Sequence, residues 1–442
     1  MKGDFSRFTH NPLSNYISVW KQQGRVDLDS DWNEQSEIFL GYLRQAIVDI
    51  VGPFAIPERT YADNDNLKAL SISNFKIGTG GIVDFTIGAG FAYIGGFPFK
   101  MSSDSKFSSQ SDYPEPEENR INGDILVFIE AWERSISYID DDFIREPALG
   151  GPDTDLRSKL VGQIKIMGIE KIRSPHEACE RIRSSFPDSN VHLTLQIDQS
   201  SQQTSMSFGE VEIAGGIIPS NLHYRIELHK GLNSDGSINE GFKWSDENGA
   251  VAVKALKALD TRRILIEELE QVTGESLKQG DWVELTNLVT ELRRSGSQMA
   301  RIESLETASG GLIVTLDSDI HPILSRRKNG VKSGLDQGLA PRLRRWSGYI
   351  TPLSPKTIYD LGRGIKAVFG CLDKNLIFEP SDFWTYAIRD REYNKLHSPQ
   401  KALPVGIRKY RHPLAIIKVH DGKSVEIIDC RRFFKPLSQF AY

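Results

Sequence analysis

The sequence predicts a mixed α+β protein that is predominantly β, with a capped N-terminal helix and several small antiparallel β subdomains of barrel-like or sandwich-like form. Two observations support this fold class. Residues 32–51 repeat their apolar side chains with helical spacing. Beyond them, short alternating apolar runs recur at intervals of roughly ten to eighteen residues with glycine turns between most of them, a pattern typical of small barrels and sandwiches.

The predicted helix begins near Trp32. Asp31 and Glu34 have the spacing of a capping box, in which each side chain satisfies a free backbone amide at the helix start. Gly52-Pro53 should end the helix. The apolar residues follow the i, i+3, i+4, i+7 pattern of a helix that buries one face. They are Ile38, Phe39, Tyr42, Leu43, Ala46, Ile47, Ile50 and Val51.

The segment before the helix is rich in aromatic residues. Phe5, Phe8, Tyr16, Val19 and Trp20 stand among polar neighbours. Large apolar side chains gathered in one segment are usually buried, so we expect this arm to pack against its own domain or against a neighbouring molecule.

A chain of 442 residues should divide into two to four domains or subdomains. We place an N-terminal arm and helix at 1–60, a first β-rich domain at 61–200 and a middle barrel-like or sandwich-like domain at 201–330. A C-terminal β-rich segment follows at 331–442, and one alternative is that it completes the first domain.

Several elements can be located within these domains. Residues 124–138 predict a central strand, with 160–167 as its partner, and 175–186 predict a short helix. An Asn-Gly turn at 248–249 predicts a hairpin between 242–245 and 249–253. The run 264–269 favours a strand, with a helix as the alternative.

Composition disfavours two classes of partner. The chain has 54 basic and 59 acidic residues and a net charge of −5, whereas proteins that bind nucleic acid or anionic membranes usually carry a basic excess. No apolar run approaches the roughly 20 residues of a membrane span, and no signal peptide is evident.

Three widely spaced cysteines indicate reduced thiols. We therefore expect synthesis and folding in the cytoplasm.

The usual motifs for phosphate binding, zinc hydrolysis and serine nucleophiles are absent from the sequence. The glycine-rich run at 78–81 favours a turn over a phosphate site. Asp27, Asp29 and Asp31 could crowd a cation, but the EF-hand pattern fails, so turn and capping roles are preferred. We expect no catalytic, cofactor-binding or metal-binding residues and no cofactor.

A basic cluster at 342–346 combines three arginines with a tryptophan. Guanidinium groups beside an aromatic ring could clamp an acidic partner. The alternative is an exposed strand that carries its arginines on the solvated face.

Several blocks resemble a family encoded in gene clusters for phage tail-like contractile injection systems. The most specific are MKGDFSRFT at 1–9 with QQGRVDLDSDWNEQ at 22–35, and REPALGGPDT at 145–154. Further similar blocks are AWER at 131–134, FKWS at 242–245, GDWVE at 280–284, LRRW at 343–346, DFW at 382–384 and DCRRFF at 429–434. The resemblance spans nearly the whole chain and implies a structural subunit near the baseplate or spike end of the particle, with no catalytic residues.

Three functions follow as hypotheses. The first is an assembly subunit that binds other baseplate or spike subunits and self-associates in a symmetric ring, within a particle that is released or moored to a membrane through partners. The second is a receptor-binding fibre or adhesin that uses the polar loops at 101–122 and 390–404. The third, a cell-wall or glycan hydrolase, needs a carboxylate pair that the sequence does not single out. The interface candidates are Phe5, Phe8, Tyr16, Trp20, Arg25, Trp32, Arg344, Arg345 and Trp346.

Overall fold

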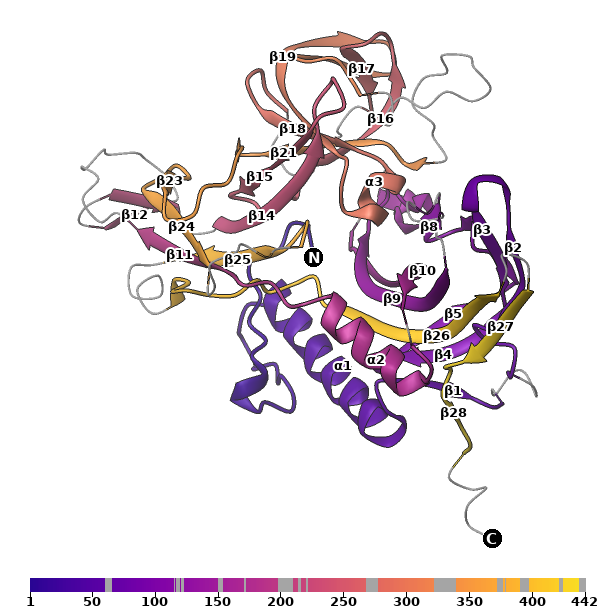
Figure 1. Cartoon of the computed structure of the whole chain (residues 1–442). Coiled ribbons are helices and arrows are strands. Elements are labelled where there is room, and N and C mark those ends of the chain that lie inside the picture. The colour runs from indigo at the N-terminus through magenta and orange to yellow at the C-terminus, as the bar shows by residue number, and fades with distance from the viewer. Residues whose placement is uncertain are drawn as a thin grey trace.

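The computed structural model confirms a mostly β protein with an N-terminal helix and several small antiparallel sheets (Figure 1). The structure describes residues 1–59, 66–114, 116, 120, 123–149, 154–170, 172–197, 210–213, 216–219, 222–267, 277–321, 339–371, 377, 379–389, 397–420 and 424–436. Part of the predicted loop at 390–404 and the end of the run at 264–269 lie outside these ranges.

The N-terminal helix α1 (Asp29–Val51) begins three residues before the predicted start. Its N-cap, Leu28, makes no side-chain cap bond, so the predicted capping box is wrong. The acidic side chains hold the arm instead. Asp29 accepts a hydrogen bond from the Ser6 amide at 2.9 Å, and Glu34 accepts one from the Thr9 hydroxyl at 2.6 Å. The predicted stop is confirmed, because Gly52 caps the helix at a positive φ of 92°.

The first β region joins strands from both ends of the chain. One antiparallel sheet has the order β10-β9-β26-β27, and a second has the order β28-β1-β4-β5 with β1 and β28 parallel. The predicted pairing of 124–138 with 160–167 is confirmed by the β9–β10 ladder. Smaller sheets are β2-β3-β6 and β7-β8. The bounds are β1 (Phe54–Pro57), β2 (Ile72–Ile77), β3 (Val83–Ile87), β4 (Gly90–Ile94), β5 (Phe97–Met101), β6 (Ser105–Lys106), β7 (Ser109–Gln110), β8 (Tyr113–Pro114), β9 (Asp124–Ile136), β10 (Arg157–Ile169), β26 (Lys409–His420), β27 (Ser424–Asp429) and β28 (Phe433–Phe434).

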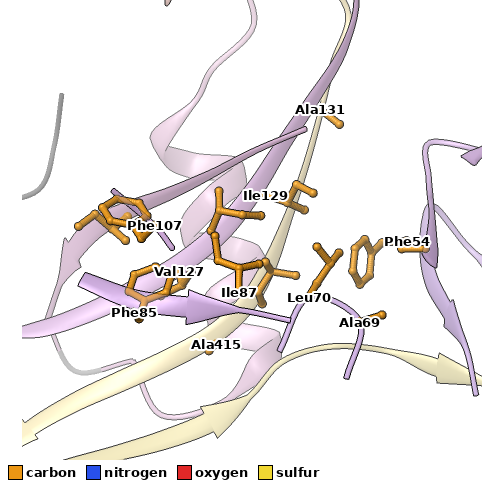
Figure 2. Close-up of a cluster of buried hydrophobic side chains, with 14 of the residues drawn as sticks. Phe54, Ala69, Leu70, Phe85, Ile87, Phe107, Val127, Ile129, Ala131 and Ala415 are labelled. Carbon is orange, nitrogen blue, oxygen red and sulfur yellow. The ribbon is translucent and has the colours of Figure 1, made fainter. Parts of the chain in front are cut away.

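Figure 2 shows the core of this region, where Phe85 and Ile87 of β3 meet Val127 and Ile129 of β9. Burying side chains of this size contributes about 1.5 to 3 kcal/mol each. Phe107 belongs to this core and stacks on Phe85 with ring centroids 4.7 Å apart. The prediction that 101–122 forms an exposed loop is therefore wrong at Phe107, because β6 and β7 fold the segment back onto the sheet.

The predicted short helix is confirmed as α2 (Pro175–Ser185). Ser174 caps it by accepting a hydrogen bond from the Glu177 amide at 3.2 Å. Ala178 and Ile182 face β9 and β26 in a separate small core. α2 thus covers the second face of the main sheet.

The middle of the chain forms a two-sheet layer and a closed barrel. The layer packs sheet β22-β15-β14-β25 against sheet β11-β24-β23 around one core, and β12 pairs with β13. The bounds are β11 (Val191–Ile197), β12 (Glu210–Ile213), β13 (Gly216–Pro219), β14 (Leu222–Leu232), β15 (Ile238–Ser245), β22 (Gly348–Ile350), β23 (Ile358–Asp360), β24 (Ile365–Cys371) and β25 (Phe383–Ile388).

The barrel has six strands in the order β16-β17-β20-β19-β18-β21 and lies at the top of Figure 1. Its strand β17 confirms the strand prediction for the described part of 264–269. The last strand, β21, lies beyond residue 330. The bounds are β16 (Ala252–Ala258), β17 (Arg263–Ile266), β18 (Trp282–Thr286), α3 (Leu288–Arg293), β19 (Gln298–Ala308), β20 (Gly311–Leu316) and β21 (Arg342–Trp346).

The predicted hairpin at the Asn-Gly turn is wrong, although the turn itself is present. Asn248 and Gly249 both have positive φ, at 54° and 61°. The strands on either side diverge, because β15 pairs with β14 and β22 whereas β16 pairs with β17 and β21. The turn therefore connects the two-sheet layer to the barrel.

Candidate assembly surface

The first nine residues of the chain, which we call the plug, enter the junction between the two-sheet layer and the barrel (Figure 1). Lys2 Nζ lies 3.0 Å from Glu227 Oε1, and the Glu227 side chain is only 1% exposed. The same ammonium group lies 5.4 Å from the centroid of the Trp346 ring. An N-terminal lysine thus completes a charged cluster inside the protein.

Backbone carbonyl groups of the plug also accept hydrogen bonds from the folded chain. The side-chain amide nitrogen of Asn248, Nδ2, donates to Met1 O at 3.1 Å and to Gly3 O at 2.9 Å. His223 Nδ1 lies 3.1 Å from Phe5 O, and the Arg389 guanidinium donates to Ser6 O. Arg225 Nη1 also donates to Met1 O, at 3.5 Å. We call the plug's partners the socket, and they are His223, Arg225, Glu227, Asn248, Trp346 and Arg389.

The socket continues into a buried ionic network. Lys243 Nζ lies 2.6 Å from Glu284 Oε1 and 3.3 Å from Glu227 Oε1, and Arg225 Nε lies 2.7 Å from Glu227 Oε2. Trp346 Nε1 donates to Glu284 Oε2 at 3.0 Å. Burial alone would raise the pKa of Glu227, but Lys2, Lys243 and Arg225 outweigh it and hold that pKa well below the usual value. In the same way, Lys243 and Lys2 outweigh burial and keep the pKa of Glu284 low.

Acid should destabilise the fold through these carboxylates. Glu227 and Glu284 have lowered pKa values in the folded state, so the unfolded chain binds more protons than the folded chain below the ordinary value of 4.5. The free energy of unfolding should therefore fall as the pH drops below about 4.5. Urea denaturation at about pH 7 and about pH 3.5 measures this effect. In a Glu284→Gln variant the free energy of unfolding should decrease less between these two pH values. An equally large decrease would show that Glu284 does not contribute to the acid sensitivity.

The helix α1 leaves most of its predicted buried face in solvent. Of that face Ile38 is buried, and Ile47 and Val51 are half-buried. The prediction of burial is wrong for the exposed residues, which are Phe39, Tyr42, Leu43, Ala46 and Ile50. Trp32, Phe39, Leu43 and Ile50 are 71%, 62%, 57% and 65% exposed. The spacing of apolar residues in the sequence identifies the apolar face of the helix, but it does not show whether that face packs against the same chain or against another molecule.

These exposed residues form a regular seam. Trp32, Ser36, Phe39, Leu43, Ala46 and Ile50 are all exposed and follow one another at alternating steps of four and three residues. We call them the apolar stripe. This spacing is the a/d heptad repeat with which one helix packs against another. The stripe runs for about 27 Å along the helix.

The arm between the plug and the helix is exposed as well. Its apolar side chains Leu13, Tyr16, Ile17, Trp20 and Val26 all face solvent. Fourteen of the 26 large apolar side chains that are exposed in the described part of the chain lie within residues 1–50. Soluble proteins rarely expose so many large apolar side chains in one segment.

The predicted interface residues divide into three groups. Tyr16, Trp20, Arg25 and Trp32 are exposed on the arm and α1. Phe5 and Phe8 belong to the plug, where Phe8 lies against His223 with ring centroids 5.2 Å apart.

The third group is the basic cluster on β21. Arg344 and Trp346 are buried and face the chain's own interior, so they are not available to a partner in this structure. Arg345 is half-buried and paired with Glu247 at 2.6 Å. The interpretation as a solvated arginine face is therefore wrong for Arg344, whereas the clamp for a partner stays a prediction. Sequence reasoning also missed Lys2 and Asn248, and only the Asn-Gly signal pointed to the latter.

No three His, Cys, Asp or Glu side chains in the described ranges gather where they could share a metal ion. Asp27 pairs with Lys21 at 3.0 Å, while Asp29 holds the arm. The run at 78–81 forms the predicted turn, a 3-10 helix. Among the helices that the structure describes, none is long and apolar enough to cross a membrane.

The geometry defines a β-rich protein with an anchored N-terminal plug and an uncovered apolar helix. Residues 1–216 match the model of a family of unknown function, DUF6519. The match includes the plug, the arm, α1 and much of the first β region, and it ends before the barrel. No curated protein and no solved structure matches the chain.

Proposed function

We propose that the protein is a structural subunit of a phage tail-like contractile injection system. It assembles in several copies at the baseplate or at its distal cap or spike periphery, after synthesis in the cytoplasm. The sequence blocks at 1–9, 22–35 and 145–154 support the type of particle. The apolar stripe supports the assembly role and is the observation on which the proposal chiefly depends.

The partner of the stripe is a helix of another particle subunit. Heptad spacing suits helix packing, in which each apolar side chain inserts between residues of the facing helix. The four large side chains of the stripe expose on the order of 500 Å² of apolar surface, which exceeds what single scattered residues leave uncovered. A helix of similar length would cover this surface.

Replacing Phe39 and Leu43 together with glutamate should prevent incorporation into particles. Both side chains are exposed, so the fold should tolerate the change within about 0.5 kcal/mol, whereas two carboxylates in a helix seam would be buried without partners. We expect at least a tenfold loss of copies per particle, measured by quantitative mass spectrometry of purified particles.

A matched control is available on the same chain. Ile238 and Ile358 are also exposed but lie outside residues 1–50, so Ile238→Glu with Ile358→Glu should leave incorporation normal. Normal copy number for the Phe39/Leu43 variant would refute the assembly role of the stripe. Particles that form normally without the whole protein but fail to attach to cells would favour a receptor-binding fibre or adhesin instead.

A further inference from the structure

We propose that the plug exchanges between copies of this chain, so that residues 1–9 of one copy fill the socket of a second copy. The plug occupies its own socket in the isolated chain. From the proposed function this inference takes only the premise that several copies assemble together.

The contacts between plug and socket are those of a bound peptide. Asn248, His223 and Arg389 contact backbone carbonyls, and Glu227 pairs with Lys2. Gly3 is buried, and a Cβ atom at this position would come within 2.4 Å of Leu156. A plug from another chain can make these same contacts, because they involve only plug and socket atoms. Exchange breaks the bonds of Ser6 with Asp29 and of Thr9 with Glu34 on the plug's own α1.

The connection between plug and helix is suited to exchange. Residues 10–28, all of which the structure describes, include no buried residue. Extended, these 19 residues would span at most about 60 Å at 3.3 Å per residue. A folded chain of this length has a radius of gyration of about 22 Å, so the connection is long enough to reach a neighbouring copy.

The plug carries the positive charge of Lys2, which complements the buried Glu227 carboxylate in the socket of a second copy. The socket's Glu227 is nearly inaccessible to solvent, and Lys2 is the plug's own cation for it. Exchange keeps the contacts between plug and socket and gives up hydrogen bonds from Ser6, Thr9 and Val19 to α1, none of which is fully buried. Swapped elements therefore link copies at low energetic cost. When each copy gives its plug to one neighbour and receives the plug of another, the contact is head-to-tail. Such contacts form a ring if the rotation between copies closes and a filament if it does not.

Two full-length variants test the exchange. Lys2→Glu with Gly3→Val disables the plug, because it sets a carboxylate against Glu227 and a side chain against Leu156. Asn248→Gly weakens the socket by removing both hydrogen bonds of the Asn248 side-chain amide, while glycine retains the positive φ of 54° at this turn. Each variant alone should remain monomeric.

An equimolar mixture of the two variants should form a one-to-one dimer, since the intact plug of one fills the intact socket of the other. Native mass spectrometry of chains with different tags identifies the mixed dimer and its dissociation constant. Adding Asn248→Gly to the plug variant should weaken the mixed dimer at least tenfold. If both variants are folded by circular dichroism and no mixed dimer forms up to about 100 μM, the exchange is refuted.

A second measurement uses only the unmodified chain, in case a variant fails to fold. Isotope-labelled and unlabelled copies mixed at high concentration should yield mixed dimers, and an excess of a synthetic peptide of residues 1–9 should disperse them. The same peptide with Lys2→Glu should be at least tenfold less effective. Dimers that are absent, or that are insensitive to the peptide, would overturn the proposal. Both experiments use purified protein and do not involve the apolar stripe. Their failure would refute the exchange but not the proposed assembly role of the stripe, which the Phe39/Leu43 variant tests separately.

Discussion

Replacing Glu284 with alanine should lower the free energy of unfolding by about 3 to 5 kcal/mol, because it leaves a buried ammonium group without its main partner. The Lys243 side chain is 3% exposed and pairs with Glu284 at 2.6 Å. Ser297 and Trp346 would also lose their acceptor. Urea denaturation at neutral pH measures the loss.

The matched control is another paired glutamate on the barrel. Glu303 pairs with Arg262 at 2.6 Å, but its side chain is 56% exposed, and exposed pairs contribute only about 0 to 1 kcal/mol. Glu303→Ala should therefore have little effect. Adding Lys243→Met to Glu284→Ala should recover part of the stability, since it removes the unpaired charge. Equal losses for the two glutamates would show that the network around Glu284 is not buried in solution.

Two tryptophans that the sequence presents alike should respond very differently to truncation. Trp346 is almost inaccessible, donates to Glu284, and its ring lies 4.6 Å from Lys243 Nζ. Trp346→Ala should cost about 3 to 5 kcal/mol. Trp20 is 85% exposed, and Trp20→Ala should change stability by less than about 0.5 kcal/mol.

Thermal and urea unfolding of both purified variants measure this contrast. A stable Trp346→Ala protein would mean that the tryptophan is available to partners, as the basic cluster first suggested. A strongly destabilised Trp20→Ala protein would mean that the arm packs on its own chain in solution.

Local patterns were sufficient for much of the fold. The continuous apolar run of β9, its partner β10 and the short helix α2 were all predicted, because the residues that determine them are near each other in sequence. The positive φ of Asn248 was likewise implied by the Asn-Gly pair.

Long-range contacts explain the predictions that were wrong. The arginines of β21 look solvated in sequence, yet Arg342 pairs with Asp140 at 2.6 Å across about 200 residues. The acidic residues at the start of α1 look like caps, yet the partners of Asp29 and Glu34 lie 23 and 25 residues earlier, in the plug. Periodicity identified the apolar face of α1, but coverage depends on the other surfaces present, which no local pattern encodes.

The pairing of β26 with β9 also constrains how the chain is made. β9 is complete at residue 136, but the strand that covers its second edge begins only at residue 409. At a translation rate of roughly 5 to 20 residues per second, the second edge of β9 stays unpaired for tens of seconds while the ribosome synthesises the residues up to β26. An unpaired apolar strand is prone to aggregate during such a delay. Production of this protein should therefore depend on chaperones that shield nascent strands until residues 409–442, which begin with β26, emerge.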